Sequence, residues 1–275
     1  MTSIAHPHPR AKHDTPPDEW NAVAEKWIER VPHDLWRKHS DAVNSLLVER
    51  WLPDRELDRI LKTDLFDEAV TGGLYPVLSR HAKCVAALDV SRTVIEAAGA
   101  KYPKLRTYEA DVRALPFESD SFDAIVSNST LDHFGDRSDI TRALIELYRV
   151  LKPGGTLIFT LDNATNPIVA VRNFLPYKLT HAARLVPYPV GKTLSSSDAR
   201  KAVASAGFEV RECTTVMHAP RVIAIPLMNT IEKIGSVSAR ARLLDLAMAF
   251  EKLAKLPTRN VTGHFVAIRA IKSPS

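Results

Sequence analysis

Residues 109–128 read EADVRALPFESDSFDAIVSN, and this stretch decides the fold class. It contains Phe122–Ser127, a short apolar run of the kind that forms a buried strand. Outward from it in both directions, strand-like and helix-like segments alternate. The further strand-like segments are Ile60–Phe66, Cys84–Leu88, Leu105–Glu109 and Thr156–Thr160, and the helix-like ones are Gly73–His81, Ser91–Ala100 and Arg137–Leu151. This alternation predicts a parallel sheet with helices on both faces, whose ligands bind beyond the carboxyl ends of the strands.

The segments on either side complete the predicted architecture. Residues 18–50 show helical periodicity, and two late strands, Phe208–Val216 and His264–Ile271, bracket a mostly helical stretch over 221–256. Ser195–Ala206 reads as a helix with serine at its start and glycine just past its end. We therefore expect an α/β fold with a doubly wound, seven-stranded, mostly parallel sheet. The expected organisation is a disordered tail over 1–17, a helical cap over 18–58, and one domain over 59–275 with lid insertions at about 163–193 and 217–262.

The composition is ordinary for a soluble globular protein, with 275 residues of which 45% are hydrophobic and 25% charged. Two distant cysteines, Cys84 and Cys213, argue against a disulfide framework or a cysteine zinc site and favour a reducing cytoplasm. No apolar run is long enough to predict a membrane-spanning helix, and residues 1–17 lack the apolar core of a secretory signal. The histidines of this tail are interpreted as solvated, and no metal site is expected; they are His6, His8 and His13.

Charge is unevenly distributed along the chain. Residues 164–275 carry 16 Lys/Arg against 6 Asp/Glu, whereas residues 1–163 carry 21 against 26. A basic C-terminal part is compatible with a plain solvated face and also with attraction to an anionic membrane surface or an acidic substrate. Nucleic acid is not an expected partner, because the basic residues are dispersed and not interleaved with aromatic ones. The sequence does not determine an oligomeric state.

Residues 60–160 resemble the core of class I S-adenosylmethionine-dependent methyltransferases. The resemblance is strongest to the methyltransferase type 11 group, which includes the ubiquinone and menaquinone C-methyltransferases. It is carried by the run over 109–128, by the segment AALDVS over 86–91, and by the turn LKPGGTLI over 151–158. The resemblance implies S-adenosyl-L-methionine as cofactor and methyl transfer to a small-molecule or lipid-like acceptor.

The same resemblance assigns cofactor contacts to residues that follow three of the predicted strands. Asp111 would accept a hydrogen bond from the exocyclic amine of adenine, while the backbone amide of Val112 donates to the ring. Asp89, followed by Val90, would bind both ribose hydroxyls, because an ionised carboxylate offers two acceptor oxygens. Asn128 would begin the wall beneath the methionine part of the cofactor. Asp89 and Asp111 lie 22 residues apart, which is usual for one βα unit.

The first cofactor loop departs from the family pattern, which has an acidic residue followed by glycines at every second position. The best alignment is DEAVTGG over 67–73, with Asp67 at the acidic position, Glu68 and Gly72 inside the loop, and Gly73 as the last glycine. A second register places Asp64 at the acidic position and lengthens the spacing to Asp89 by three residues. Glycines here let the backbone approach the ligand closely, so their loss puts cofactor affinity in doubt.

The residues just before this loop are also unusual. Lys62, Thr63 and Asp64 are polar, although a central parallel strand is normally an almost continuous apolar run. We expect these side chains to turn inward and to replace contacts that the missing glycines normally give.

A general base is needed only when the acceptor is a hydroxyl or an acidic carbon. His133, in the segment LDHF that follows the fourth predicted strand, is the best-placed candidate. His181, His218 and His264 are further candidates. The two lid segments are apolar and basic, which is compatible with plain core packing or with a lipophilic acceptor pocket.

Two other classes of function stay open. A methyltransferase fold that no longer catalyses, and serves as a binding or partner protein, would explain the altered glycine loop. Another nucleotide-binding α/β enzyme, such as a dehydrogenase, is disfavoured because a dinucleotide site needs glycines at the first βα turn to hold a pyrophosphate.

Overall fold

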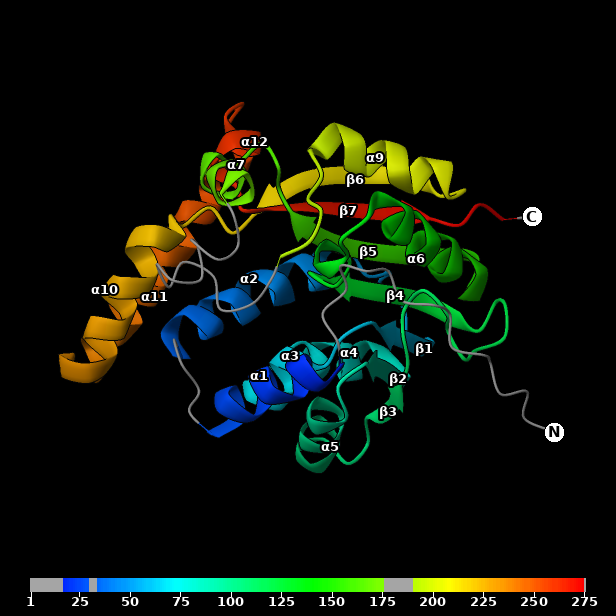
Figure 1. Ribbon diagram of the computed structural model, residues 1–275, viewed down its shortest axis with the longest axis horizontal. Helices are drawn as coiled ribbons and strands as arrows, with labels where there is room; N and C mark the ends of the chain where they lie inside the picture. Colours follow the sequence, from blue (N-terminus) through cyan, green and yellow to red (C-terminus); the bar gives the residue numbers. More distant parts are fainter. Residues whose placement is uncertain (1–16, 30–33, 176–189, 275) are drawn as a thin grey trace.

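The strands predicted from the sequence pair into one sheet (Figure 1). The computed structural model describes residues 17–29, 34–175 and 190–274. Its seven-stranded sheet has the order β3-β2-β1-β4-β5-β7-β6. The first five strands pair in parallel, whereas β7 is antiparallel to both of its neighbours, β5 and β6. The strands are β1 Leu57–Lys62, β2 Ala82–Asp89, β3 Arg106–Glu109, β4 Phe122–Asn128, β5 Leu151–Asp162, β6 Glu209–Val216 and β7 Phe265–Ile271.

Helices cover both faces of this sheet, as the alternation of segments predicted. The described helices are α1 Pro17–Glu29, α2 Asp34–Trp51, α3 Phe66–Val70, α4 Tyr75–His81, α5 Arg92–Lys101, α6 Arg137–Val150, α7 Pro167–Phe174, α9 Ser196–Ser205, α10 Arg221–Ile234, α11 Val237–Ala249 and α12 Arg259–Thr262, with 3-10 helices η1 Leu131–His133 and η2 Phe250–Lys255. None of the helices in the described part of the chain has both the length and the apolar character needed to cross a membrane.

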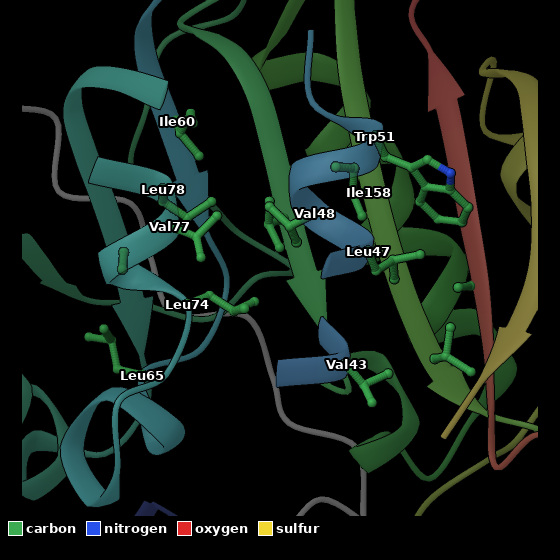
Figure 2. Packing of buried hydrophobic residues seen from close by; sticks show 14 of the residues in the cluster. Val43, Leu47, Val48, Trp51, Ile60, Leu65, Leu74, Val77, Leu78 and Ile158 are labelled. Atoms are coloured by element: carbon green, nitrogen blue, oxygen red, sulfur yellow. The ribbon is translucent and has the colours of Figure 1, made fainter. Parts of the chain in front are cut away.

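The sheet has a hydrophobic core on each face. Neighbouring residues of a strand belong to different cores, because successive side chains of a strand point to opposite faces. Ile60 belongs to the core shared with α2, α4 and α5, whereas Leu61 belongs to the core shared with α6 and α9. Ile158 of β5 lies on the same face as Ile60. Figure 2 shows Val48 and Trp51 of α2 packed over this face. Burial on both faces explains why the central strands are nearly continuous apolar runs.

The strand directions bring six carboxyl ends to one edge of the sheet. β6 runs parallel to β5, because β7 is antiparallel to both strands. The carboxyl ends of β1, β2, β3, β4, β5 and β6 therefore share this edge, which we call the carboxyl edge. Helices α10 and α11 form a hairpin inserted between β6 and β7, and Figure 1 shows the hairpin extending beyond the end of β6.

The fold class predicted from the sequence is confirmed, with one shifted boundary that matters for the site. β1 ends at Lys62 and not at Phe66, because Phe66 is already the first residue of α3. The predicted division into tail, helical cap and lid-bearing domain remains a prediction. Residues 1–16 of the predicted tail, and 176–189 of the first predicted lid, lie outside the described residues.

Candidate functional site

Asp89 is the last residue of β2, and its carboxylate lies at the carboxyl edge. One carboxylate oxygen accepts a hydrogen bond from the amide of Leu65 at 3.0 Å, and the other accepts from the amide of Ser91 at 2.9 Å. Burial raises the pKa of Asp89 above its ordinary value, and these two amides limit the rise. An ionised carboxylate has about four acceptor positions, so both oxygens retain acceptor capacity.

Asp111 follows β3 and lies close to Asp89, since the amide of Ala110 donates to the Asp89 carbonyl at 3.0 Å. Its carboxylate is held by Arg113, whose Nη2 lies 2.6 Å from Oδ2 and whose Nε lies 3.0 Å from Oδ1. Arg113 is buried and also lies 3.4 Å from Asp139 on α6. The backbone amide of Arg113 also donates to Oδ1 at 2.8 Å, so Arg113 takes up most of the acceptor positions of Asp111.

The end of β4 adds a polar group to the same edge. The Asn128 amide oxygen accepts a hydrogen bond from the Thr160 hydroxyl of β5 at 2.7 Å. Thr63, just after β1, is buried and bonds the hydroxyls of Ser127 at 3.0 Å and Thr130 at 2.8 Å. These bonds tie the ends of three adjacent strands together beside the half-exposed Asn128.

Lys62 fills the space beneath the first loop. Its side chain is 2% exposed, and its ammonium lies 3.1 Å from the carboxylate of Asp64 and 2.9 Å from that of Glu68. The ammonium also donates to the Asp64 carbonyl at 2.7 Å. Burial opposes the charge of Lys62, but the surrounding carboxylates hold its pKa above the ordinary value. The polar residues at the end of β1 do turn inward, and they form a buried ion-pair cluster.

The position of the Glu68 side chain explains why the loop has a glycine at position 73. Its carboxylate oxygen Oε1 accepts hydrogen bonds from the amides of Leu74 at 2.8 Å and Tyr75 at 3.1 Å, at the start of α4. Gly73 has a φ of +61°, and a Cβ built on it would lie 2.5 Å from the Glu68 side chain. Gly73 is therefore required by packing on Glu68.

The structure does not bring Gly72 together with Asp89. The Tyr102 hydroxyl, just past the last residue of α5, donates to the Gly72 carbonyl at 2.8 Å. Asp89 precedes the first residue of α5, a helix of 10 residues. At about 1.5 Å per residue, the two ends of α5 are about 15 Å apart. Asp67 also faces elsewhere, because Arg37 of α2 binds its carboxylate at 2.9 Å.

Helix α1 lies across the carboxyl edge. The side-chain oxygen of Asn21 accepts a hydrogen bond from the Ser91 hydroxyl at 2.6 Å, next to Asp89. Trp20 packs edge-on against the His133 ring, with centroids 4.9 Å apart. One helix thus contacts both the residues after β2 and those after β4. The sequence predicted a helix here without showing that it covers this edge.

Beyond β4, a second group of ionisable side chains gathers where β5 ends and β7 begins. The Asp162 carboxylate lies 2.7 Å from Arg172 of α7 and 3.3 Å from His264 Nε2. The same His264 nitrogen lies 3.0 Å from Arg221, the first residue of α10. Because arginine can only donate, this contact makes His264 Nε2 an acceptor. Burial and the adjacent Arg221 lower the pKa of His264, in agreement with a neutral ring.

Asp132 joins this group from η1. Its Oδ2 accepts hydrogen bonds from the Ser129 hydroxyl at 2.9 Å and the Asp162 amide at 3.1 Å. Its Oδ1 is buried and has no hydrogen-bond partner among the described residues. Burial, and then the charge of Asp162, raise the pKa of Asp132 above its ordinary value. Sequence reasoning chose the neighbouring His133; the only signal for Asp132 was an acidic residue in the same short segment after a strand.

The other candidate histidine that is described has a structural environment. His218 is buried, with Nδ1 2.8 Å from the Thr262 hydroxyl and Nε2 3.0 Å from the Thr215 carbonyl. Both ring nitrogens are thus used to join the end of β6 to α12. His181 lies outside the described residues.

Residues 69–159 match the family model for the methyltransferase domain. Residues 69–159 of this chain thus form a methyltransferase domain. A malonyl-[acyl-carrier protein] O-methyltransferase of Enterobacter lignolyticus is 31% identical over 150 residues, which cover 53% of this chain and 55% of that protein. A demethylmenaquinone methyltransferase of Streptomyces avermitilis is 31% identical over 153 residues, covering 54% of this chain and 62% of the relative. The chain thus spans little more than half the length of these curated relatives.

The fold of the methyltransferase domain is shared with solved structures. A SAM-dependent methyltransferase from Thermotoga maritima matches with a TM-score of 0.57 and 18% identity, covering 93% of this chain and 97% of that one. This likeness confirms the predicted fold class, and the family-model match over 69–159 supports the predicted methyltransferase family. The residue assignments within the site remain predictions.

The side chains of this methyltransferase domain fit the ribose end of the cofactor. Asp89 retains acceptor capacity for two hydroxyls while two backbone amides hold its carboxylate in place. At the predicted adenine end Val112 is buried, and the role of its backbone amide remains a prediction. Arg113 holds the Asp111 carboxylate and leaves little of its acceptor capacity for an amine. Of the loop residues predicted to bind the cofactor, Glu68 and Gly73 serve the folding of the loop itself.

Proposed function

We propose that this chain transfers a methyl group from S-adenosyl-L-methionine to a small-molecule or lipid-like acceptor. The proposal rests on two carboxylates at one sheet edge: Asp89, which has remaining acceptor positions, and Asp132, which has a buried oxygen with no hydrogen-bond partner among the described residues. Asp89 can accept hydrogen bonds from the two hydroxyls of a ribose, and Asp132 can accept a proton from the methyl acceptor. A purely structural carboxylate rarely leaves a buried oxygen unpaired, because this costs about 1–3 kcal/mol.

The residues of the chain divide the work of such a transfer. The cofactor supplies a methyl group already activated on a sulfonium, so the protein has mainly to align the acceptor. Asp89 holds the ribose, and α1 excludes water through Asn21 and Trp20. Asp132, whose carboxylate is held by a hydrogen bond from the Asp162 amide, takes a proton from a hydroxyl or acidic carbon of the acceptor.

The relatives support an acceptor of this kind. Their names give a malonyl group on an acyl carrier protein and a menaquinone precursor as acceptors of those proteins. We further propose a cytoplasmic location, which the two free cysteines, Cys84 and Cys213, support.

Calorimetric titration tests the proposal directly. We expect heat on addition of S-adenosylmethionine and of its demethylated product, and none with NAD. Methyl transfer is then followed as release of the demethylated product with a panel of quinols, phenols and acyl carboxylates. Absence of heat with both adenosyl compounds contradicts the proposal.

The alternative of a non-catalytic binding protein also has a specific observation in its favour. Asp111 is occupied by Arg113, and the first loop is filled by Lys62 and Glu68. The same titration separates the two functions, because a protein that has lost the cofactor gives no heat with S-adenosylmethionine.

Replacing Asp132 by asparagine should slow methyl transfer by about 10²–10⁴-fold, the usual contribution of a positioned acid or base. The substitution keeps one oxygen to accept from Ser129 and Asp162. In the wild type the rate should rise with pH through the raised pKa of Asp132, because only the carboxylate accepts a proton. The variant should lose this rise and bind the cofactor normally.

The rate of product release with the best acceptor of the panel, measured across pH, checks this prediction. Asp245→Asn, at an exposed position on α11, serves as the matched control and should keep the wild-type profile. An unchanged pH profile in the Asp132 variant contradicts the assignment of Asp132 as the base.

A further inference from the structure

The α10–α11 hairpin presents an apolar helix face to solvent. Exposed positions of α10 recur at helical spacing, and five of the seven are apolar. They are Val222, Ile223, Pro226, Leu227, Thr230, Lys233 and Ile234. Ile223 is 64% exposed and Ile234 is 80% exposed, which is unusual for side chains whose burial is worth about 1.5–3 kcal/mol. We call this set the α10 outer face.

The opposite side of α10 already has its partners. Met228 is fully buried, and Ala224, Ile225 and Ile231 pack against the core that contains α2. Helix α10 therefore carries apolar residues on both sides, although only one side contacts the rest of the described structure. Burial of the core side alone does not account for the apolar residues of the outer face.

The charges exposed around this face are mainly positive. Between residues 221 and 256 the acidic Glu232 and Glu251 accept backbone hydrogen bonds, from Leu35 in one case and from Met217 and His218 in the other. The exposed charged residues of α10 and α11 are Lys233, Arg242 and Asp245, and η2, which directly follows α11, adds the exposed Lys252 and Lys255. An apolar helix face beside basic side chains is the pattern of a helix that lies in the interface of an anionic bilayer.

The hairpin is also placed beside the acceptor end of the site. α10 begins at the carboxyl edge, where its first residue, Arg221, contacts His264. Phe174, the last residue of α7, is 88% exposed, and Figure 1 shows α7 at the same end of the molecule as the hairpin. A surface docked on the outer face would therefore lie close to Asp132 and Asp162.

We propose that the α10 outer face docks onto an anionic lipid bilayer. The exposed charged residues between 221 and 256 are mainly basic, so an anionic bilayer is favoured over a neutral surface. Docking itself does not depend on methyl transfer; the corollary that a lipid acceptor enters from the bilayer rests on the proposed function.

Vesicle co-sedimentation of the full chain, without cofactor or acceptor, tests the docking. At low salt we expect binding to phosphatidylcholine vesicles that contain phosphatidylglycerol, and much weaker binding to phosphatidylcholine alone. The double variant Ile223→Gln/Ile234→Gln should bind at least about tenfold more weakly, because it removes two apolar side chains from the bilayer contact. Replacing Lys233, Lys252 and Lys255 by glutamine should remove the preference for anionic vesicles.

Ile145→Gln is the matched control, since Ile145 is 52% exposed on α6, away from the hairpin. It should bind vesicles as the wild type does. Absence of binding to anionic vesicles, or an equal loss in the control, overturns the proposal. Sedimentation velocity gives the remaining outcome: a dimer that the double variant dissociates would assign the face to a second copy of the chain. Calorimetry with S-adenosylmethionine on the double variant keeps this result separate from the proposed function, because the substitutions lie outside the cofactor residues.

Discussion

Asp89→Ala is expected to weaken S-adenosylmethionine binding by about 100-fold, the largest effect on the cofactor of any single substitution in the site. The variant removes the acceptor for two ribose hydroxyls, and each charge-assisted hydrogen bond is worth about 1.5 kcal/mol. It also leaves the amides of Leu65 and Ser91 without their carboxylate, so the first loop loses its anchor to β2.

Calorimetric titration measures this effect, with thermal unfolding of each variant to show that it is folded. Asp111→Ala is the informative comparison. Because Arg113 already holds the Asp111 carboxylate, we expect a smaller loss of affinity than in the Asp89 variant. Unchanged affinity for S-adenosylmethionine in both variants would show that the cofactor does not bind at this edge of the sheet.

Lys62→Met is expected to lower the free energy of unfolding by about 3–5 kcal/mol, the cost of removing one partner from a buried ion pair. Methionine fills a similar volume, so the loss comes from charge. The carboxylates of Asp64 and Glu68 would remain buried without their cation. Denaturant titration measures the change.

The pH dependence of this variant follows from the sign of the carboxyl shifts. Burial already raises the pKa of Asp64 to about 6, and Lys62 limits that rise. Removing Lys62 raises the folded-state pKa further. A carboxyl whose pKa is higher in the folded than in the unfolded protein binds more protons in the folded state. Its contribution to the free energy of unfolding is therefore most favourable at acid pH and falls as the pH rises. The variant should therefore approach the wild type as pH is lowered.

Two controls separate a buried charge effect from a general effect of losing a lysine. Lys83 lies 2.8 Å from Asp58 but is 61% exposed, so Lys83→Met should change stability little. Adding Glu68→Gln to Lys62→Met should recover part of the loss, because the glutamine oxygen can still accept from Leu74. A Lys62 variant as stable as the Lys83 variant would contradict the proposed role of the cluster.

The side-chain contacts of the altered first loop could not be predicted from the sequence. The sequence established that two glycines are missing and that polar residues stand at the end of β1. It did not show that Lys62 and Glu68 meet, because five residues lie between them and Lys62 ends a strand whereas Glu68 belongs to the following helix. The contact arises only when α3 folds back over the end of β1, which brings Glu68 to the ammonium.

The acceptor end shows the same limit over longer separations. Asp132, Asp162 and His264 come from η1, β5 and the start of β7, and α7 and α10 add an arginine each. Each residue alone is an unremarkable polar position beside a strand. Local patterns favoured His133 because a histidine after a strand is visible in the sequence, whereas an unpaired buried carboxylate oxygen is not.

The sequence by itself determined the alternation of strands and helices, and with it the sheet and the ends at which Asp89, Asp111 and Asn128 stand. Strand periodicity and capping residues are local, so they can be recognised along the chain. Only the tertiary structure decided that Arg113 binds Asp111, that α1 covers the edge, and that one Asp132 oxygen has no hydrogen-bond partner in the part of the chain that is described. Those facts depend on burial and on distances between residues far apart in the chain, which no local pattern encodes.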